Sequence, residues 1–251
     1  AHEFVVELAS AIKALVSKIG ADGEVLGVGV GAPCANYRKG SIDNAANVTW
    51  ATGKVVPFAN MLSAALDGIP VALTNDANAA ALGEMYYGAA RGMKDFIVIT
   101  LGTGVGSGIV IDGKIVYGHD GFAGELGHVR AVKHNGRVCG CGGVGCLETY
   151  CSAIGISRTA RELLEIQSDV PSTLRDLDVI TAKDVQEAAF AGDAIANKVY
   201  EFTGRILGEA LASFIAFSAP EAIILFGGVA KARRLLYDPA FKAMNETVCP
   251  L

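Results

Sequence analysis

Residues 96–117 read FIVITLGTGVGSGIVIDGKIVY, a stretch in which short apolar runs alternate with glycines. The pattern predicts a strand, a glycine turn, a strand, a tight hairpin and a strand, in that order, over Phe96–Ile99, Gly102–Gly108, Ile109–Ile111, Asp112–Gly113 and Ile115–Tyr117. Because β-branched residues rather than a helix follow the glycines, the run matches neither a Rossmann dinucleotide site nor a P-loop. Backbone N–H groups of such a turn, with the hydroxyls of Thr103 and Ser107, could still bind phosphate. A purely structural turn explains the glycines equally well.

The segments on either side alternate between helical and extended patterns. Apolar residues recur at helical spacing over His2–Gly20, which ends in a glycine typical of a helix terminus. The further elements expected are strands at Val25–Val30, Val71–Thr74 and Ala222–Phe226, helices at Ala77–Tyr87, Leu147–Glu165 and Ala194–Phe217, and a polar connection at Gln167–Asp178. This alternation indicates an α/β protein. A boundary near Arg91–Gly92 would divide it into domains 1–91 and 92–251.

The composition excludes several classes of protein. Of the 251 residues, 51% are hydrophobic and 19% are charged, and the mean hydropathy is +0.39, so a disordered or highly charged chain is not expected. The net charge of −5 and the lack of a basic run give no electrostatic basis for nucleic-acid binding. The longest uncharged stretch, Phe96–Ile111, is interrupted by glycines and is too short to span a bilayer, so no membrane segment is expected.

A second glycine-rich segment carries cysteines. Cys139, Cys141 and Cys146 lie within eight residues of one another, and three thiolates on such a turn need only one further ligand to complete a tetrahedral zinc site. The spacing allows either His128 or His134 to be that ligand. Three buried free cysteines are the less favoured alternative. The remaining cysteines are interpreted as small hydrophobic residues: Cys34, Cys151 and Cys249.

Acidic residues near the two glycine segments are candidates for acid–base chemistry. Asp76 follows an apolar strand directly at a helix start, where it is either a helix cap or a general base. Glu125 and His128 are three residues apart and would share one face of a helix, and Glu148 closely follows the cysteines. If one ring nitrogen of His128 binds a metal, the other can meet a substrate. Each glutamate taken alone would be a solvated surface charge.

Several motifs occur in the order and spacing of the ROK family (repressors, uncharacterised reading frames and sugar kinases), which this chain resembles. They are TNDANAA at Thr74–Ala80, LGTGVG at Leu101–Gly106, ELGH at Glu125–His128, CGCGGVGCLE at Cys139–Glu148, and FGG at Phe226–Gly228, which is similar to the family's adenosine-contacting motif. The resemblance covers nearly the whole chain. It implies an actin-like ATPase (ribonuclease H-like) fold, in which two α/β domains close over a cleft that holds a sugar near the hinge and ATP above it.

The resemblance also implies an activity and a set of residue roles. A sugar kinase of this kind would transfer the γ-phosphoryl group of Mg-ATP to a hexose, first of all glucose to glucose 6-phosphate, with Asp76 as general base. The implied ligands are Asn75, Asp76, Glu125, His128 and Glu148 for the sugar, Gly102, Thr103, Gly104, Gly106, Gly227 and Gly228 for ATP, and His128, Cys139, Cys141 and Cys146 for a structural Zn²⁺. The alternatives are a kinase for N-acetylmannosamine, fructose, mannose or allose, or a sugar-sensing ROK transcription regulator, against which the acidic charge argues.

Further expectations concern the extent and setting of the chain. The family begins with a strand and an Asp-x-Gly-x-Thr phosphate loop that this sequence lacks, so we expect the chain to be truncated at both ends. The expected partners are a small-molecule sugar and ATP. The resemblance further implies a cytoplasmic protein that forms a homodimer or homotetramer.

Overall fold

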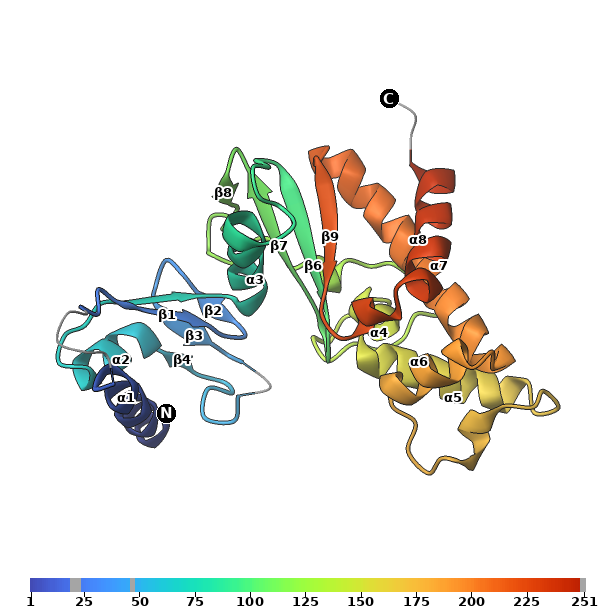
Figure 1. Cartoon of the computed structure of the whole chain (residues 1–251), viewed down its shortest axis with the longest axis horizontal. Coiled ribbons are helices and arrows are strands. Elements are labelled where there is room, and N and C mark those ends of the chain that lie inside the picture. Colours follow the sequence, from blue (N-terminus) through green and yellow to red (C-terminus); the bar gives the residue numbers. More distant parts are fainter. Residues whose placement is uncertain (19–23, 46–47, 249–251) are drawn as a thin grey trace.

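The computed structural model describes residues 1–18, 24–45 and 48–248 and shows two lobes connected through helix α3 (Figure 1). Residues 1–74 form the first lobe and residues 94–248 the second. Gly20, the predicted last residue of the first helix, and Cys249 lie outside the described residues.

The first lobe consists of small sheets and two helices. Its elements are α1 (His2–Val16), β1 (Val28–Gly31), β2 (Ala35–Asn36), β3 (Ser41–Asp43), β4 (Val55–Val56), α2 (Phe58–Ala65) and β5 (Val71–Thr74). β1 pairs in parallel with β5, and β2, β3 and β4 form an antiparallel sheet. The buried residues of this lobe form their own core, which includes Phe58, Leu62 and Leu73.

The second lobe is built on a four-stranded sheet in the order β8-β7-β6-β9. Its strands are β6 (Phe96–Leu101), β7 (Val105–Ile111), β8 (Lys114–Ile115) and β9 (Ala222–Phe226). β6 pairs antiparallel with β7 and parallel with β9, so the predicted hairpins and the late strand belong to one mixed sheet. The helices are η1 (Leu126–His128), α4 (Glu148–Cys151), α5 (Ala153–Ile166), η2 (Thr173–Asp176), α6 (Ala182–Phe190), α7 (Ala194–Ser218), η3 (Val229–Ala232) and α8 (Arg234–Thr247).

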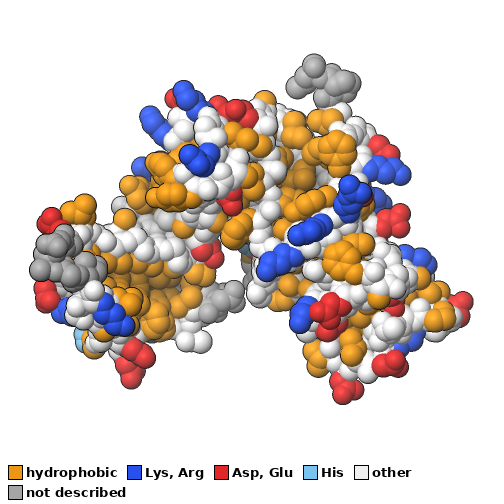
Figure 2. Space-filling view, viewed as in Figure 1, with side chains coloured by type: hydrophobic (Ala, Val, Ile, Leu, Met, Phe, Trp, Pro, Cys, Tyr) orange, Lys and Arg blue, Asp and Glu red, His pale blue; other side chains and the backbone are white. Residues whose placement is uncertain are grey.

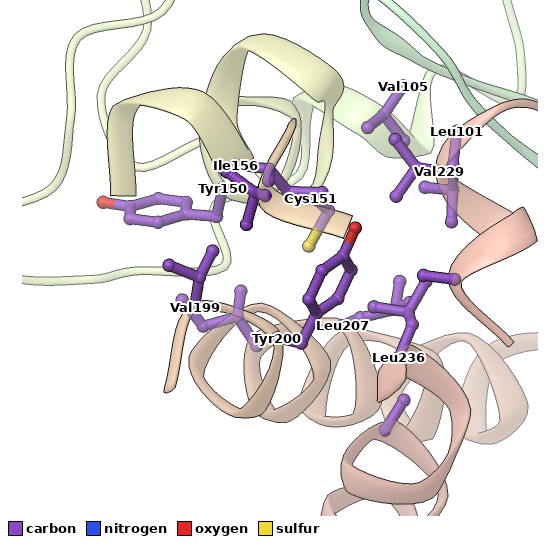
Figure 3. Packing of buried hydrophobic residues seen from close by; sticks show 14 of the residues in the cluster. Leu101, Val105, Tyr150, Cys151, Ile156, Val199, Tyr200, Leu207, Val229 and Leu236 are labelled. Atoms are coloured by element: carbon purple, nitrogen blue, oxygen red, sulfur yellow. The ribbon is translucent and has the colours of Figure 1, made fainter. Parts of the chain in front are cut away.

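The largest core lies where the helices of the second lobe pack on its sheet. Figure 3 shows Tyr200 and Leu207 of α7 facing Cys151 and Ile156, with Leu101 of β6 nearby. All five side chains are at most 1% exposed. Because this core begins directly behind the ends of β6 and β7, it fixes the backbone of the glycine turn between them.

Helix α3 (Asp76–Tyr87) lies between the lobes and contacts β1 on one side and β6 and β7 on the other (Figure 1). Ala81 of α3 is fully buried in a small cluster with Phe96, Val98 and Val110 of the second lobe. The domain boundary near Arg91–Gly92 stays a prediction. Helix α3, which precedes this boundary in the chain, packs against strands β6 and β7, which follow it.

Most predicted elements are confirmed, but several differ in their bounds. The first helix ends at Val16 rather than at Gly20, and the strand predicted over Ile115–Tyr117 covers Lys114–Ile115. The first strand begins at Val28 rather than Val25. The glycine run is not one turn, because β7 begins at Val105 and takes up its second half. The helix predicted over Leu147–Glu165 is interrupted at Ser152, which adopts extended geometry and caps α5 through its side chain. No helix in the described part of the chain is long and apolar enough to cross a bilayer.

Candidate active site

Asn75 and Asp76 lie where β5 ends and α3 begins. Asn75 is the helix cap, because its side chain accepts a hydrogen bond from the N–H of Ala77 at 2.9 Å. Asp76 occupies the first helical position, and its Oδ1 also accepts from the N–H of Ala77 at 2.9 Å. Since Asn75 supplies the cap, the exposed carboxylate of Asp76 is not required for that purpose.

The glycine turn lies beside Glu148, the first residue of α4. Glu148 Oε2 accepts a hydrogen bond from the N–H of Val105 at 3.0 Å, and a Cβ on Gly104 would lie 2.5 Å from the same oxygen. The N–H of Gly102 is used within the turn, to Gly104 O at 3.0 Å. No hydrogen bond among the described residues uses the N–H of Thr103 or Gly104, so these donors are available to a ligand.

The N–H of Gly106 and the hydroxyl of Ser107 were also candidate donors to phosphate, but both bind groups within the protein. The N–H of Gly106 donates to Thr100 Oγ1 at 3.1 Å. Ser107 was expected to offer its hydroxyl to phosphate, but it is buried and donates to the carbonyl of Gly124. The same oxygen accepts from the N–H of Leu126 at 3.1 Å. Ser107 therefore holds the segment that carries Glu125.

Glu125, His128, Glu148 and Asp76 come together in one region. Glu125 Oε2 lies 4.0 Å from His128 Nε2. Burial raises the pKa of Glu125, His128 opposes the shift, and the negative charges of Asp76 and Glu148 add to it. A carboxyl group surrounded by other carboxylates and an imidazole offers both acceptors and donors to hydroxyl groups of a ligand.

Cys34 packs against the core of the first lobe, as its interpretation as a small hydrophobic residue predicts, and it also lies near the acidic residues. It is half-buried and has a positive φ of 52°. Burial raises the pKa of its thiol, and the charges of Glu125, Asp76 and Asp43 raise it further. Figure 2 shows the open notch that separates the lobes below α3.

The cysteine loop gathers four potential metal ligands. One ligand atom each from His128, Cys139, Cys141 and Cys146 lies within 4.8 Å of all the others. Cys141 and Cys146 Sγ are 3.7 Å apart, and Cys139 Sγ is 3.8 Å from His128 Nδ1. A tetrahedral zinc with about 2.3 Å bonds to sulfur requires edges of about 3.8 Å, so the donor set fits such an ion.

Burial and a backbone N–H shift the pKa values of the cysteine thiols in opposite directions. Burial raises the pKa of Cys139 to about 12. At Cys141 the N–H of Gly143, 3.4 Å from Sγ, is the main cause of a lowered pKa. Such a partly buried set needs a bound cation to remain fully ionised. His134, the other candidate ligand, lines a separate hollow with Arg158 and Glu162.

Arg137 connects the cysteine loop to the helices of the second lobe through hydrogen bonds. It was not predicted from the sequence as a functional residue. Its side chain is only 7% exposed. It donates to Thr149 O at 2.8 Å, to Thr159 Oγ1 at 2.8 Å and to Glu162 Oε2 at 2.5 Å. The guanidinium also lies 4.6 Å from the centre of the Tyr150 ring. The only sequence signal was an arginine next to the cysteines.

The second glycine turn, Gly227–Gly228, lies next to the first. A Cβ on Gly227 would be 2.5 Å from the carbonyl oxygen of Leu101, the last residue of β6. The turn opens onto a hollow of about 790 Å³ that Lys231 and Tyr237 help to line. The two turns expected to face ATP are therefore adjacent at one edge of the sheet.

Comparison with known families identifies the chain, because residues 2–249 match the ROK family. The chain belongs to the ROK family. A glucokinase of Halalkalibacterium halodurans is 43% identical over 220 residues, which cover 86% of this chain and 65% of that protein. The chain thus spans slightly less than two thirds of that relative.

Solved structures of ROK proteins share the fold. A ROK glucokinase from Streptomyces griseus, solved with glucose and AMPPNP, superposes with a TM-score of 0.81 at 34% identity, covering 97% of this chain and 78% of that one. A ROK transcriptional regulator homologous to Escherichia coli MLC superposes with a TM-score of 0.86 at 30% identity, covering 98% and 61%. This ROK chain therefore has the actin-like ATPase fold, as expected from its motifs.

Proposed function

We propose that this ROK chain binds a hexose and Mg-ATP in the region between its lobes and takes part in phosphorylation of the hexose, first of all of glucose at the hydroxyl on carbon 6. The observation that carries the proposal is the convergence of Asp76, Glu125, Glu148 and His128 beside the glycine turn. The glucokinase relative and the Streptomyces griseus complex with glucose and AMPPNP support glucose and ATP as the substrates.

Asp76 acts as general base in this proposal. Its carboxylate takes the proton of the sugar hydroxyl while that oxygen attacks the γ-phosphorus, the new P–O bond forms and the bond to the departing ADP breaks. The side chains of Asn75, Glu125, His128 and Glu148 hold the other hydroxyls. Glu148 keeps Oε2 on the N–H of Val105, which fixes its carboxylate next to the donor site.

The glycine turns supply the ATP site of the proposal. The unoccupied N–H groups of Thr103 and Gly104 face the phosphates, with Gly102 and Gly106 giving the turn its shape and Gly227–Gly228 bordering the nucleoside. Mg²⁺ bound to ATP would neutralise charge that develops on the transferred phosphoryl group.

We also propose that His128, Cys139, Cys141 and Cys146 hold one structural Zn²⁺. A Cys₃His set has no open position, so its role is to orient His128 and, through the short segment after Cys146, Glu148. Cys141→Ser should lose the metal and weaken glucose binding, whereas Cys34→Ser, which changes a cysteine outside the ligand set, should keep the metal. Elemental analysis that finds well under one zinc per unsubstituted chain would contradict the proposal.

The kinase proposal is tested by ADP release with Mg-ATP and a panel of glucose, mannose, fructose, allose and N-acetylmannosamine. Asp76→Asn should lower turnover by about 100-fold or more and leave glucose binding largely intact, because it removes the base and keeps the shape. Asp112→Asn, an exposed hairpin residue, is the matched control. If no sugar gives turnover but glucose still raises thermal stability, the chain is better interpreted as a sugar sensor.

A further inference from the structure

A turn of the first lobe reaches directly into the second. Asn36 at the end of β2 is fully buried, and its Nδ2 donates to the carbonyl of Asp120 at 2.7 Å. Its Oδ1 accepts from the N–H of Lys39 at 3.2 Å. A Cβ on Gly121 would lie 2.6 Å from the same Oδ1. The carboxamide is therefore enclosed by residues of both lobes.

The two residues after Asn36 extend the contact. Arg38 donates twice to the carbonyl of Gly118, from Nε at 3.1 Å and from Nη2 at 2.8 Å. The rings of Tyr37 and Tyr117 stack with centroids 4.4 Å apart and an 8° interplanar angle. We call the contact of residues 36–38 with residues 117–121 the lobe latch.

The lobe latch is the hydrogen-bonded link between the lobes. Among the described residues, every hydrogen bond between residues 1–74 and residues 94–248 is made by Asn36 or Arg38, and no ion pair joins the two ranges. Apart from the latch, the lobes are connected through α3.

The latch holds the segment that leads to Glu125. Within that segment the N–H of Phe122 donates to Asp120 Oδ1 at 3.1 Å, and the N–H of Ala123 donates to Tyr117 O at 3.1 Å. Ser107 binds the residues on both sides of Glu125, Gly124 and Leu126. The segment that carries Glu125 is therefore held by its own lobe at residues 124 and 126 and by the other lobe at residues 118–120.

We propose that Asn36 and Arg38 are positioning residues for sugar binding, which rests on the proposed function. By holding residues 118–120 they restrict the segment that leads to Glu125, and so they help to keep the Glu125 carboxylate in place relative to Asp76. A sugar held by Glu125 binds the latched form better, so it shifts the population toward that form.

The experiment measures glucose binding by calorimetry in Arg38→Gln, with Lys39→Gln as the matched control. Arg38 and Lys39 are both exposed cations on the same turn, but the side chain of Lys39 pairs with Asp43 inside the first lobe. Arg38→Gln should weaken glucose binding about tenfold, or about 1.4 kcal/mol. Arg38→Lys should recover part of the loss, and Lys39→Gln should bind as the unsubstituted chain does. Asn36→Ala should act like Arg38→Gln, with a larger effect on thermal stability because its site is buried.

Small-angle X-ray scattering without sugar gives a readout that is independent of the proposed function. Arg38→Gln should be more expanded than Lys39→Gln. The substitution removes the two hydrogen bonds from Arg38 to Gly118 and so weakens the lobe latch, which connects the lobes together with α3. Failure of the unsubstituted chain to bind any hexose would overturn the proposed function, while the scattering result would still decide whether the latch holds the lobes together. Unchanged glucose affinity in folded Arg38→Gln and Asn36→Ala, or unchanged dimensions in both, would overturn the positioning role.

Discussion

Replacing Arg137 with methionine tests whether one buried guanidinium holds the cysteine loop on the helices. Methionine keeps an apolar stem that can lie over Tyr150, but it loses the hydrogen bonds to Thr149, Thr159 and Glu162. Breaking a buried ion pair costs about 3–5 kcal/mol. Glu162 is 42% exposed, so its end of the pair remains hydrated and the lower end of that range applies, about 3 kcal/mol.

Arg158→Met is a close control because Arg158 binds the same carboxylate. Its Nε lies 2.8 Å from Glu162 Oε1, but its side chain is 47% exposed. Exposed pairs of this kind contribute about 0.5 kcal/mol or less. At about 3 °C per kcal/mol, Arg137→Met should lower the Tm of the second lobe by about 9 °C and Arg158→Met by less than about 2 °C, as followed by circular dichroism on zinc-loaded protein. Equal shifts in the two variants would refute the claim that burial, rather than charge alone, makes Arg137 important.

Two further predictions use the same region. Burial acts to raise the pKa of Glu162, but the hydrogen bonds and charges of Arg137 and Arg158 outweigh it and the net shift is downward. Stability from this group is therefore present above the ordinary glutamate pKa of about 4.3 and is lost as the pH falls through the lowered value; the Tm difference between unsubstituted protein and Glu162→Gln should be constant above about pH 5 and shrink below it. Gly104→Ala should displace Glu148, because the added Cβ would lie 2.5 Å from Oε2, and should weaken glucose binding about tenfold or more. Gly102→Ala, which meets nothing within 4 Å, should leave glucose affinity unchanged, and equal affinities for both variants in calorimetry would contradict this account.

Local patterns predict the elements whose signals are contained in a few residues. The strand Val71–Thr74 and the helix after Asp76 have an apolar run, a capping asparagine and a terminal glycine in continuous sequence. Strands β2 and β4 have only two residues each, which is too short to show a periodic pattern in the sequence, and neither strand was predicted. The cysteine loop was recognisable because metal ligands tend to be closely spaced along a chain.

Residues that act through distant partners could not be found in this way. Arg137 is bonded to residues 12 to 25 positions away along the chain. Asn36 meets Asp120, 84 positions away. In the sequence Cys34 resembles any small apolar residue. Only the folded chain brings it near the charges of Glu125, Asp76 and Asp43, which raise the pKa of its thiol. In each case the side chain's role depends on packing between segments, which a single sequence does not encode locally.

The close seating of α3 on β7 determines which distances can change when the lobes move. Gly106 and Gly108 leave no room for side chains: an added Cβ would lie 3.0 Å from Ala77 Cβ at the first and 2.6 Å from Ala81 Cβ at the second. Backbone therefore rests on backbone, and α3 cannot slide along the strand without a collision. Asp76 at the start of α3 and the glycine turn at the start of β7 travel as one rigid unit. Under the proposed function, a movement of the first lobe would then leave the alignment between Asp76 and the glycine turn unchanged while a sugar enters or leaves.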